Sequence, residues 1–346
     1  MQALVFRGPT EFRVEEREIP QPGPGEALVH VEACGICGTD LRIAAGVHRA
    51  YLPGTIRVPG HEFAGTLVSV GDDVGLSTGR RVFIAPNIGC GTCAACRRGR
   101  VNLCVRPQAL GITRDGGFAE YVLLGADLIQ QGNVLPLPDD LDAASAALAE
   151  PLACVLRGSK AARITADDLV VIFGAGPIGL LHVAIAALGS PRAIVVVEPN
   201  ERRRERSSSW GATHLVDPTT IDPRVVVDKL SDGVGADAVI VAAPVAAAQR
   251  QALELAGPGG RVNFFGGLPS NGSRVELDTN LIHYKELIVT GTSANTNDDC
   301  REALNLARGG KIDLGALVTA RFALPDAKAA FAAASSGEAL KVVIEP

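Results

Sequence analysis

Six runs of consecutive apolar residues alternate with helical segments in the second half of the chain. They are LVVIF (169–173), AIVVVE (193–198), HLVD (214–217), AVIVAA (238–243), RVNFF (261–265) and ELIVTGT (286–292). A strand without polar alternation is buried on both faces, as in a parallel sheet with helices on each side. Because crossovers are right-handed, the pattern predicts an α/β fold with a doubly wound, six-stranded Rossmann sheet.

The first part of the chain has a different pattern. Up to about residue 148 it contains short Val/Ile/Leu runs bounded by Gly and Pro, such as ALVHVEA (27–33), which predicts a β-rich domain with long loops. After about residue 295 we expect one helix (299–308) and a final strand, KVVIEP (341–346). Since so short a tail cannot form a core, we expect domains at 1–148 plus 296–346 and at 149–295.

Composition narrows the class of partner. The 346 residues have a formal net charge of -5, which argues against general attraction to nucleic acid or anionic lipid and favours small molecules. The N-terminus has no signal-peptide pattern, and no apolar stretch reaches the roughly 18 residues of a membrane span. We therefore expect a cytoplasmic protein that binds neither nucleic acid nor membrane.

A glycine-rich turn follows the first apolar run and opens a helix. Its glycines permit a tight turn and close approach of a pyrophosphate to the helix N-terminus. Glu198 stands at the end of the next run, 24 residues after the first glycine, near the roughly 20 expected of a ribose-binding acid. The alternative is a turn that only packs a helix. The candidate cofactor residues of the turn are Gly174, Gly176, Pro177, Ile178 and Gly179.

The acid favours NAD over NADP, because a carboxylate repels a 2′-phosphate. Three arginines, Arg202 to Arg204, complicate this choice. They are either a solvated helix face or residues that stack on adenine or accept the extra phosphate.

Four cysteines, Cys90, Cys93, Cys96 and Cys104, form the pattern C-x2-C-x2-C-x7-C. Four thiolates can close a tetrahedron around Zn²⁺ with no open position, as in structural zinc sites. Free or disulfide-paired thiols and an iron–sulfur cluster are the alternatives. Nearby arginines raise a further possibility, a zinc module that binds the phosphate backbone of nucleic acid. A gel shift at low salt would test it. The arginines are Arg97, Arg98, Arg100 and Arg106.

A second, looser set contains Cys37, His61, Glu62 and Glu150. A thiolate, an imidazole and a carboxylate can hold a zinc ion that keeps a position for water or substrate, as catalytic zinc sites do. His61 could instead be structural, and Glu150 could simply begin a helix.

The ordered series CGICGTD, PGHEFAG, the four cysteines, AEPLACV and VIFGAGPIG resembles the zinc-containing medium-chain dehydrogenases, in the sorbitol (L-iditol) and threonine dehydrogenase branch. The resemblance covers essentially the whole chain. It implies a GroES-like catalytic domain, a Rossmann domain, an active site in the cleft between them, and a homodimer or homotetramer.

The same resemblance implies two zinc ions per chain, with Cys37 and His61 as ligands of the catalytic ion and Glu62 or Glu150 as the next ligand. Family alcohol dehydrogenases carry Cys where this chain has Glu150, which points to polyols; amino-alcohol or aminocyclitol oxidation is the nearest rival. It also places Ile178, Glu198, Arg203 and Thr292 at the NAD site.

The predicted reaction is hydride transfer from a secondary alcohol to the nicotinamide. Thr39, two residues after Cys37, would start the relay that carries the hydroxyl proton outward. Many relatives have His shortly after this motif, whereas this chain reads Leu41-Arg42. Either His48 or water therefore continues the relay.

Overall fold

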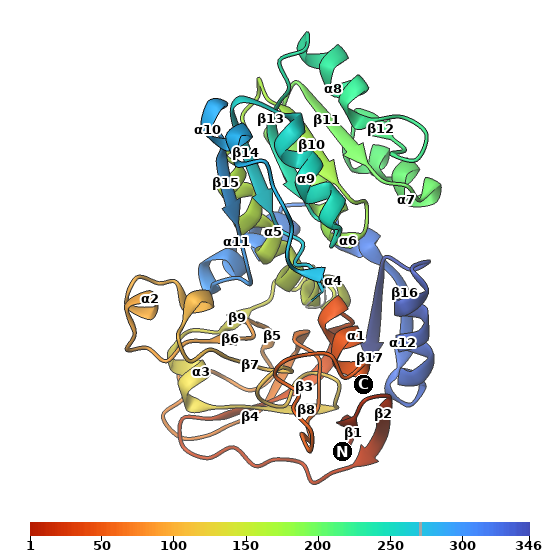
Figure 1. The fold of residues 1–346 in the computed structure, drawn as a ribbon. Helices are drawn as coiled ribbons and strands as arrows, with labels where there is room; N and C mark the ends of the chain where they lie inside the picture. The colour runs from red at the N-terminus through yellow and green to blue at the C-terminus, as the bar shows by residue number, and fades with distance from the viewer. Residues whose placement is uncertain (270–271) are drawn as a thin grey trace. The chain divides into compact units, whose positions relative to one another are not determined.

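The computed structural model describes residues 1–269 and 272–346 and contains the predicted six-stranded parallel sheet (Figure 1). The strand order β12-β11-β10-β13-β14-β15 is that of a doubly wound Rossmann sheet, with its switch point between β10 and β13. The prediction from the apolar runs is confirmed. The strands are β10 (Leu169–Phe173), β11 (Ala193–Val197), β12 (His214–Val216), β13 (Ala236–Val241), β14 (Ala256–Phe264) and β15 (Ile288–Gly291).

Burial explains why these runs are strands. Every residue of β10 and β11 is buried, so both faces of these strands are covered. Apolar side chains of β10, β11 and β13 share one hydrophobic core with those of the crossover helices. The intervening helical segments are α6 (Pro177–Leu188), α7 (Glu201–Arg206), η2 (Ser207–Trp210), α8 (Pro223–Ser231), α9 (Ala246–Leu255) and α10 (Thr279–Tyr284).

The β-rich part is built on a seven-stranded sheet, with the order β16-β17-β3-β4-β5-β9 and β8 paired to β3. Two small ribbons, β1–β2 and β6–β7, accompany it. The strands of the first 148 residues are β1 (Gln2–Gly8), β2 (Glu11–Glu16), β3 (Ala27–Gly35), β4 (Glu62–Val70), β5 (Arg81–Ile84), β6 (Asn87–Ile88), β7 (Gln108–Ala109), β8 (Tyr121–Leu124) and β9 (Val134–Pro136). The helical segments are α1 (Gly38–Ala44), α2 (Ala94–Arg97), η1 (Val101–Leu103), α3 (Ala126–Gln130), α4 (Ala143–Ala147) and α5 (Ala149–Ala162).

The C-terminal tail contains more than the predicted helix and strand, so that prediction was incomplete. Between α11 (Asn297–Arg308) and β17 (Lys341–Glu345) lie η4 (Gly315–Leu317), β16 (Val318–Ala323), η5 (Leu324–Asp326) and α12 (Ala327–Ser336). β17 pairs antiparallel with β3, and β16 pairs parallel with β17. β16 was missed because its apolar positions are only half-buried at the edge of the sheet.

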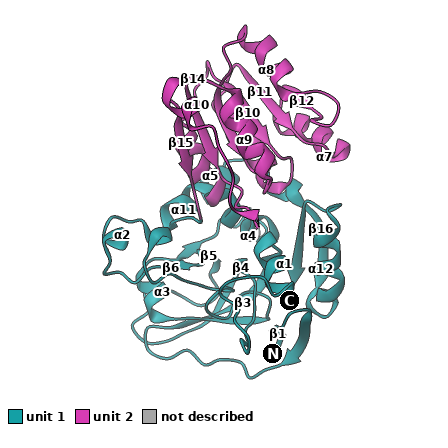
Figure 2. Ribbon diagram, in the orientation of Figure 1, with its two compact units in different colours: residues 1–153, 294–346 teal, residues 154–293 magenta. Residues whose placement is uncertain are grey.

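The chain divides into two compact units, shown in Figure 2. Unit 1 comprises Met1–Ala153 with Ala294–Pro346, and unit 2 comprises Cys154–Ser293. The domain limits expected from the sequence, at 148/149 and 295/296, remain a prediction. Within residues 1–269 and 272–346, no helix has the length and apolar character needed to cross a membrane.

Candidate metal centres and cofactor loop

Strand pairing in unit 1 brings the CGTD and GHE motifs together. Cys37 is the N-cap of α1 just after β3, and His61 immediately precedes β4, which begins at Glu62. In the antiparallel pairing of the two strands, Gly35 lies opposite Glu62. As a result, the ligand atoms of Cys37, His61 and Glu62 all lie within 4.8 Å of one another.

Asp40 connects the two motifs, although its role was not predicted. Its carboxylate accepts hydrogen bonds from the backbone N–H of Cys37 (2.8 Å) and of Gly60 (3.3 Å). Asp40 Oδ1 also lies 3.7 Å from His61 Nδ1, a buried nitrogen without a hydrogen-bond partner among the described residues. Burial would lower the pKa of His61, but the nearby Asp40 and Cys37 charges outweigh it and raise that pKa. A carboxylate behind an imidazole is typical of metal-binding histidines.

Glu62 is fully buried and paired with a buried cation. Lys341 Nζ, at the start of β17, donates to Glu62 Oε1 (2.6 Å) and Oε2 (2.5 Å) and to the Ile36 carbonyl (3.2 Å). Burial would lower the pKa of Lys341, but the Glu62 and Cys37 charges raise it, so the lysine stays charged. The carboxylate at this site is therefore offset by a fixed positive charge.

Glu150 faces the same site from the first turn of α5. Its side chain is buried, and Asn295 Nδ2 donates to its Oε1 at 2.7 Å. Burial raises the pKa of Glu150, and His61, Glu62 and Lys341 also act on its charge. Its oxygens do not belong to the set within 4.8 Å, so the structure brings Glu62 directly to Cys37 and His61 and places Glu150 beside them.

These residues fit a zinc ion. Cys37, His61 and Glu62 supply the sulfur, nitrogen and oxygen donors that Zn²⁺ accepts, on a largely buried site. His61 Nδ1, unsatisfied but near Asp40, leaves the other ring nitrogen available to a metal.

The structure does not connect the proposed relay residues. Thr39 Oγ1 accepts a hydrogen bond from Arg42 Nη2 (3.0 Å), while His48 Nδ1 accepts from the backbone N–H of Ala50 (3.3 Å). In the described chain no hydrogen bond joins Thr39 to His48. Burial, helped by Arg42 and Arg49, lowers the pKa of His48.

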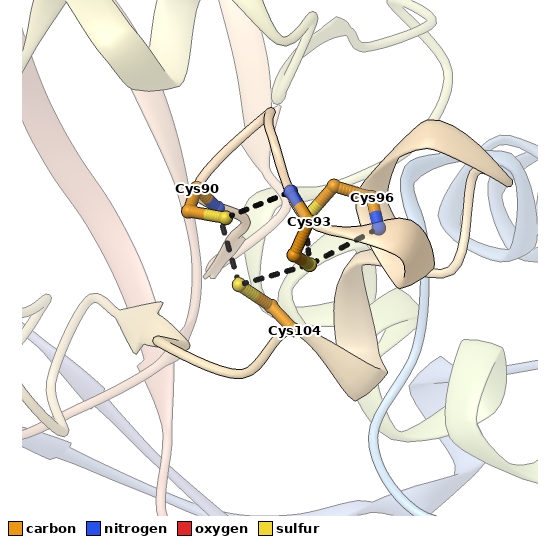
Figure 3. Close-up of side chains that lie close together, drawn as sticks. All are labelled: Cys90, Cys93, Cys96 and Cys104. Carbon is orange, nitrogen blue, oxygen red and sulfur yellow. Dashed lines mark hydrogen bonds between the residues drawn. The ribbon is translucent and has the colours of Figure 1, made fainter.

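The four cysteines gather in one lobe, as Figure 3 shows. Their sulfurs lie within 4.8 Å of one another, with Cys93 Sγ 3.5 Å from Cys96 Sγ and 4.0 Å from Cys104 Sγ. Four thiolates at a Zn–S distance of about 2.3 Å would be about 3.8 Å apart, so the spacing fits the ion. All eight cysteines are free of disulfides, against the disulfide alternative.

Backbone N–H groups also point at these sulfurs. Cys90 N donates to Cys104 Sγ (3.2 Å), Cys93 N to Cys90 Sγ (3.4 Å) and Cys96 N to Cys93 Sγ (3.5 Å). Hydrogen bonds from the Thr92 hydroxyl and from the backbone N–H groups of Thr92 and Cys93 lower the pKa of Cys90 to about 5, whereas burial and the neighbouring Cys93 raise the pKa of Cys96 to about 11.

In unit 2 the glycine loop has the geometry that a dinucleotide needs. Gly174 has φ +97°, and a Cβ on Gly179 would lie 1.9 Å from the Gly174 carbonyl oxygen. A Cβ on Gly176, the N-cap of α6, would meet nothing within 4 Å, so the backbone is open to a ligand there. Pro177 and Ile178 begin the helix.

Glu198 lies beside this loop. Its carboxylate accepts from the backbone N–H of Ala175 (2.8 Å) and of Asn200 (2.9 Å), which fixes it after β11. Arg204 Nη1 donates a hydrogen bond to the Glu198 main-chain oxygen (2.8 Å). The neighbouring Arg203 is half-buried. Thr292 follows β15, and because β13 and β14 separate β15 from β10, it is not adjacent to the loop within the sheet.

Sequence reasoning missed Asp40, Lys341 and Asn295 as site residues. A lysine at the start of an otherwise apolar strand was a signal for Lys341. Asn295 carried none, because its contact with Glu150 spans 145 residues.

Comparison with known proteins finds similar sequences over the whole chain. Residues 23–139 match the family described as "Alcohol dehydrogenase GroES-like domain", and residues 177–308 match "Zinc-binding dehydrogenase". The chain is 32% identical to sorbitol dehydrogenase of Halalkalibacterium halodurans, over 100% of the chain and 99% of that protein. It is 34% identical to L-threonine 3-dehydrogenase of Thermococcus kodakarensis, over 100% and 98%.

A solved structure described as a zinc-binding dehydrogenase from Sinorhizobium meliloti 1021, bound to NADP, is also similar. It has a TM-score of 0.90 and 36% identity, and the match covers 100% of this chain and 99% of that one.

Proposed function

This chain belongs to the zinc-containing medium-chain dehydrogenases, in the sorbitol and threonine dehydrogenase branch, and from that premise we propose that it oxidises a secondary alcohol of a polyol with NAD. Membership of this family means that the chain is an enzyme that oxidises small-molecule alcohols. The observation that carries the proposal is the cluster of half-buried Cys37 with buried His61 and Glu62, and with Glu150 beside it.

Side chains of unit 1 would bind the metal ion, orient its ligands and transfer the proton. Cys37, His61 and one carboxylate, Glu62 or Glu150, would hold Zn²⁺, and Asp40 orients both Cys37 and His61. When bound, the ion supplies Lewis acidity that lowers the pKa of a substrate hydroxyl. The Thr39 oxygen, which already accepts from Arg42, would use its second lone pair to accept the proton of the substrate hydroxyl and would pass its own hydrogen outward.

A second zinc ion would be structural. The four thiolates of Cys90, Cys93, Cys96 and Cys104 close the coordination shell and leave no position for substrate. Its role would be to hold the lobe folded, since a stretch this rich in loops has little core of its own.

Glu198 supports NAD as the cofactor. Its buried carboxylate is fixed by two backbone N–H groups next to the glycine loop, where it can accept from ribose hydroxyls and repel a 2′-phosphate. The S. meliloti protein was solved with NADP, so both cofactors belong in the test.

Glu150, which stands where family alcohol dehydrogenases have Cys, supports a polyol such as sorbitol or L-iditol as the substrate. The similarity to a sorbitol dehydrogenase supports the same substrate class. The threonine dehydrogenase relatives favour a second candidate, an amino alcohol or aminocyclitol. Both are secondary alcohols with a neighbouring polar group, and both would place their hydroxyl at the same site.

The test is a panel of polyols, cyclitols and amino alcohols assayed for NADH and NADPH formation. We expect turnover of a polyol with NAD, and loss of turnover in Cys37→Ala. The matched control is Cys34→Ala, which removes a buried thiol three residues away and outside the ligand cluster. Turnover that survives Cys37→Ala would refute the proposed site, whereas turnover of amino alcohols alone would refute the polyol.

We also propose a homodimer or homotetramer, on the family resemblance alone. Light scattering of the purified protein at micromolar concentration would decide it, and a monomer would contradict it.

A further inference from the structure

We propose that Asn295 is a positioning residue for Glu150, and that Asn87, at the base of the four-cysteine lobe, holds the Asn295 amide in the orientation that its contact with Glu150 requires. The inference rests on the proposed function, because Glu150 matters only if the Cys37–His61–Glu62 site is the reactive one. Asn295 and Asn87 are remote from each other in the chain, yet both act on that site through one carboxylate.

Asn295 contacts Glu150 twice. Its Nδ2 donates to Glu150 Oε1 at 2.7 Å and to the Glu150 main-chain oxygen at 3.2 Å, so the side chain and the start of α5 are held together. Asn295 is fully buried and Glu150 nearly so. A buried carboxylate gains more from each hydrogen bond than an exposed one, so this contact restricts where its oxygens lie.

The direction of the Asn295 amide follows from its neighbours. Asn87 Nδ2 lies 3.3 Å from the Asn295 main-chain oxygen, which can only accept, and 2.8 Å from Asn295 Oδ1. Because the main-chain oxygen requires the N–H side of Asn87, Asn295 must present its oxygen to Asn87, and the Cys300 thiol lies against the same oxygen at 3.5 Å. Its N–H side meets Glu150, whose main-chain oxygen can likewise only accept, so the neighbours on both sides require one orientation of the amide.

Asn87 in turn is built into the lobe. Asn87 is the first residue of β6, and it pairs with Ala109 of β7. This pairing brings together the two ends of the segment that carries the four cysteines. Asn133 Nδ2 donates to the Asn87 carbonyl at 2.8 Å, which fixes the strand from the other side. A continuous set of hydrogen bonds therefore runs from the lobe through Asn87 and Asn295 to Glu150.

This arrangement makes a specific variant informative. In Asn87→Asp the side chain has no N–H to donate, so the Asn295 amide must either face two oxygens or turn and present its own oxygen to Glu150. Either outcome displaces Glu150 without altering any residue that touches it. Asn295→Ala removes the contact directly, and Asn295→Asp places a second carboxylate against Glu150.

The experiment compares Asn295→Ala, Asn295→Asp and Asn87→Asp with Asn305→Ala. Asn305 lies further along α11, the helix that follows Asn295, and is exposed. The readouts are kcat and KM for the best alcohol, the thermal midpoint, and the visible spectrum of protein with Co²⁺ exchanged into the Cys37–His61 site.

We expect Asn295→Ala and Asn87→Asp each to lower kcat by about 10- to 100-fold, the usual effect of losing a partner that orients groups at a metal. Their Co²⁺ bands should shift and KM for NAD should stay the same, whereas Asn305→Ala should change neither kcat nor the Co²⁺ bands. In the double variant Asn87→Asp/Asn295→Ala, the two effects should not add, because Asn87 acts through Asn295.

Unchanged kcat and Co²⁺ bands in Asn295→Ala would overturn the proposal, as would full additivity in the double variant. If Asn295→Ala fails to fold, Asn87→Asp alone decides, since it leaves the Glu150 contact residues intact. A wild-type protein that binds no Co²⁺ at Cys37 and oxidises no alcohol would instead refute the proposed function, and the positioning role with it.

Discussion

Lys341 and Glu62 form a buried ion pair in unit 1, with Nζ 2.6 Å from Oε1 and side-chain exposures of 5% and 0%. The pair joins β17, the last strand of the chain, to β4, which directly follows His61. Because Nζ donates to both carboxylate oxygens, the buried negative charge of Glu62 is compensated directly.

Replacing this lysine should therefore be costly. We expect Lys341→Met to lower the free energy of unfolding by about 3–5 kcal/mol, because it leaves the Glu62 charge buried and unpaired. The double variant Lys341→Met/Glu62→Gln should recover part of that loss. Urea denaturation measures both, with the exposed Lys311→Met as the control. Equal stability of Lys341→Met and Lys311→Met would contradict this view of the pair.

His182 should make unit 2 sensitive to acid. It is fully buried, with Nδ1 3.2 Å from Ser159 Oγ and its ring 4.7 Å from that of Phe265, and burial lowers its pKa from 6.5 to about 3. Between these values the unfolded chain binds a proton that the folded chain does not. The contribution of neutral His182 to the free energy of unfolding is therefore complete above pH 6.5 and is lost as the pH falls toward 3.

The slope from this one residue is at most about 1.4 kcal/mol per pH unit. His182→Asn, which does not titrate, should flatten the decline of unfolding free energy between pH 6 and 4, whereas the exposed His283→Gln should not. Parallel pH profiles for wild type and His182→Asn would show that His182 is not the group responsible.

Glu198 should control the choice of cofactor. Glu198→Gln removes the charge that opposes a 2′-phosphate, so the ratio of kcat/KM for NAD over NADP should fall by about 10-fold or more, equivalent to at least 1.4 kcal/mol. Steady-state kinetics with each cofactor measure it. Glu201→Gln, exposed and three residues further on, should leave the ratio unchanged. An unaltered ratio in Glu198→Gln would assign the selectivity elsewhere.

Thr39 should act in proton transfer. Thr39→Ala should lower kcat by about 100-fold or more, within the range of lost general acid–base catalysis, while Thr39→Ser retains activity. Metal content measured on the same samples should be unchanged, because Thr39 is not in the ligand cluster. Full activity of Thr39→Ala would exclude the relay.

The parts of the fold that sequence predicted are those with a local signal. β10 and β11 are buried on both faces, so their residues are all apolar and their strands could be recognised. The four cysteines lie within fifteen residues, and a metal ion imposes their spacing. Local patterns thus identified the Rossmann sheet and the donor groups.

What sequence could not predict depends on contacts between distant segments. Lys341 meets Glu62 across 279 residues, and Asn295 meets Glu150 across 145. Lys341 reaches Glu62 because β17 pairs with β3, and Asn295 reaches Glu150 because of the path of the chain into α11. A local pattern of apolar residues predicts neither contact. β16 was missed for a related reason, since an edge strand has a weak apolar pattern.

Anomalous X-ray diffraction at the zinc edge, from crystals of the purified protein, would locate both metal sites at once. We expect two peaks per chain, one among Cys90, Cys93, Cys96 and Cys104 and one bounded by Cys37 Sγ and His61. The second should disappear in Cys37→Ala while the first remains. A single peak among the four cysteines, in crystals grown with zinc present, would contradict the account.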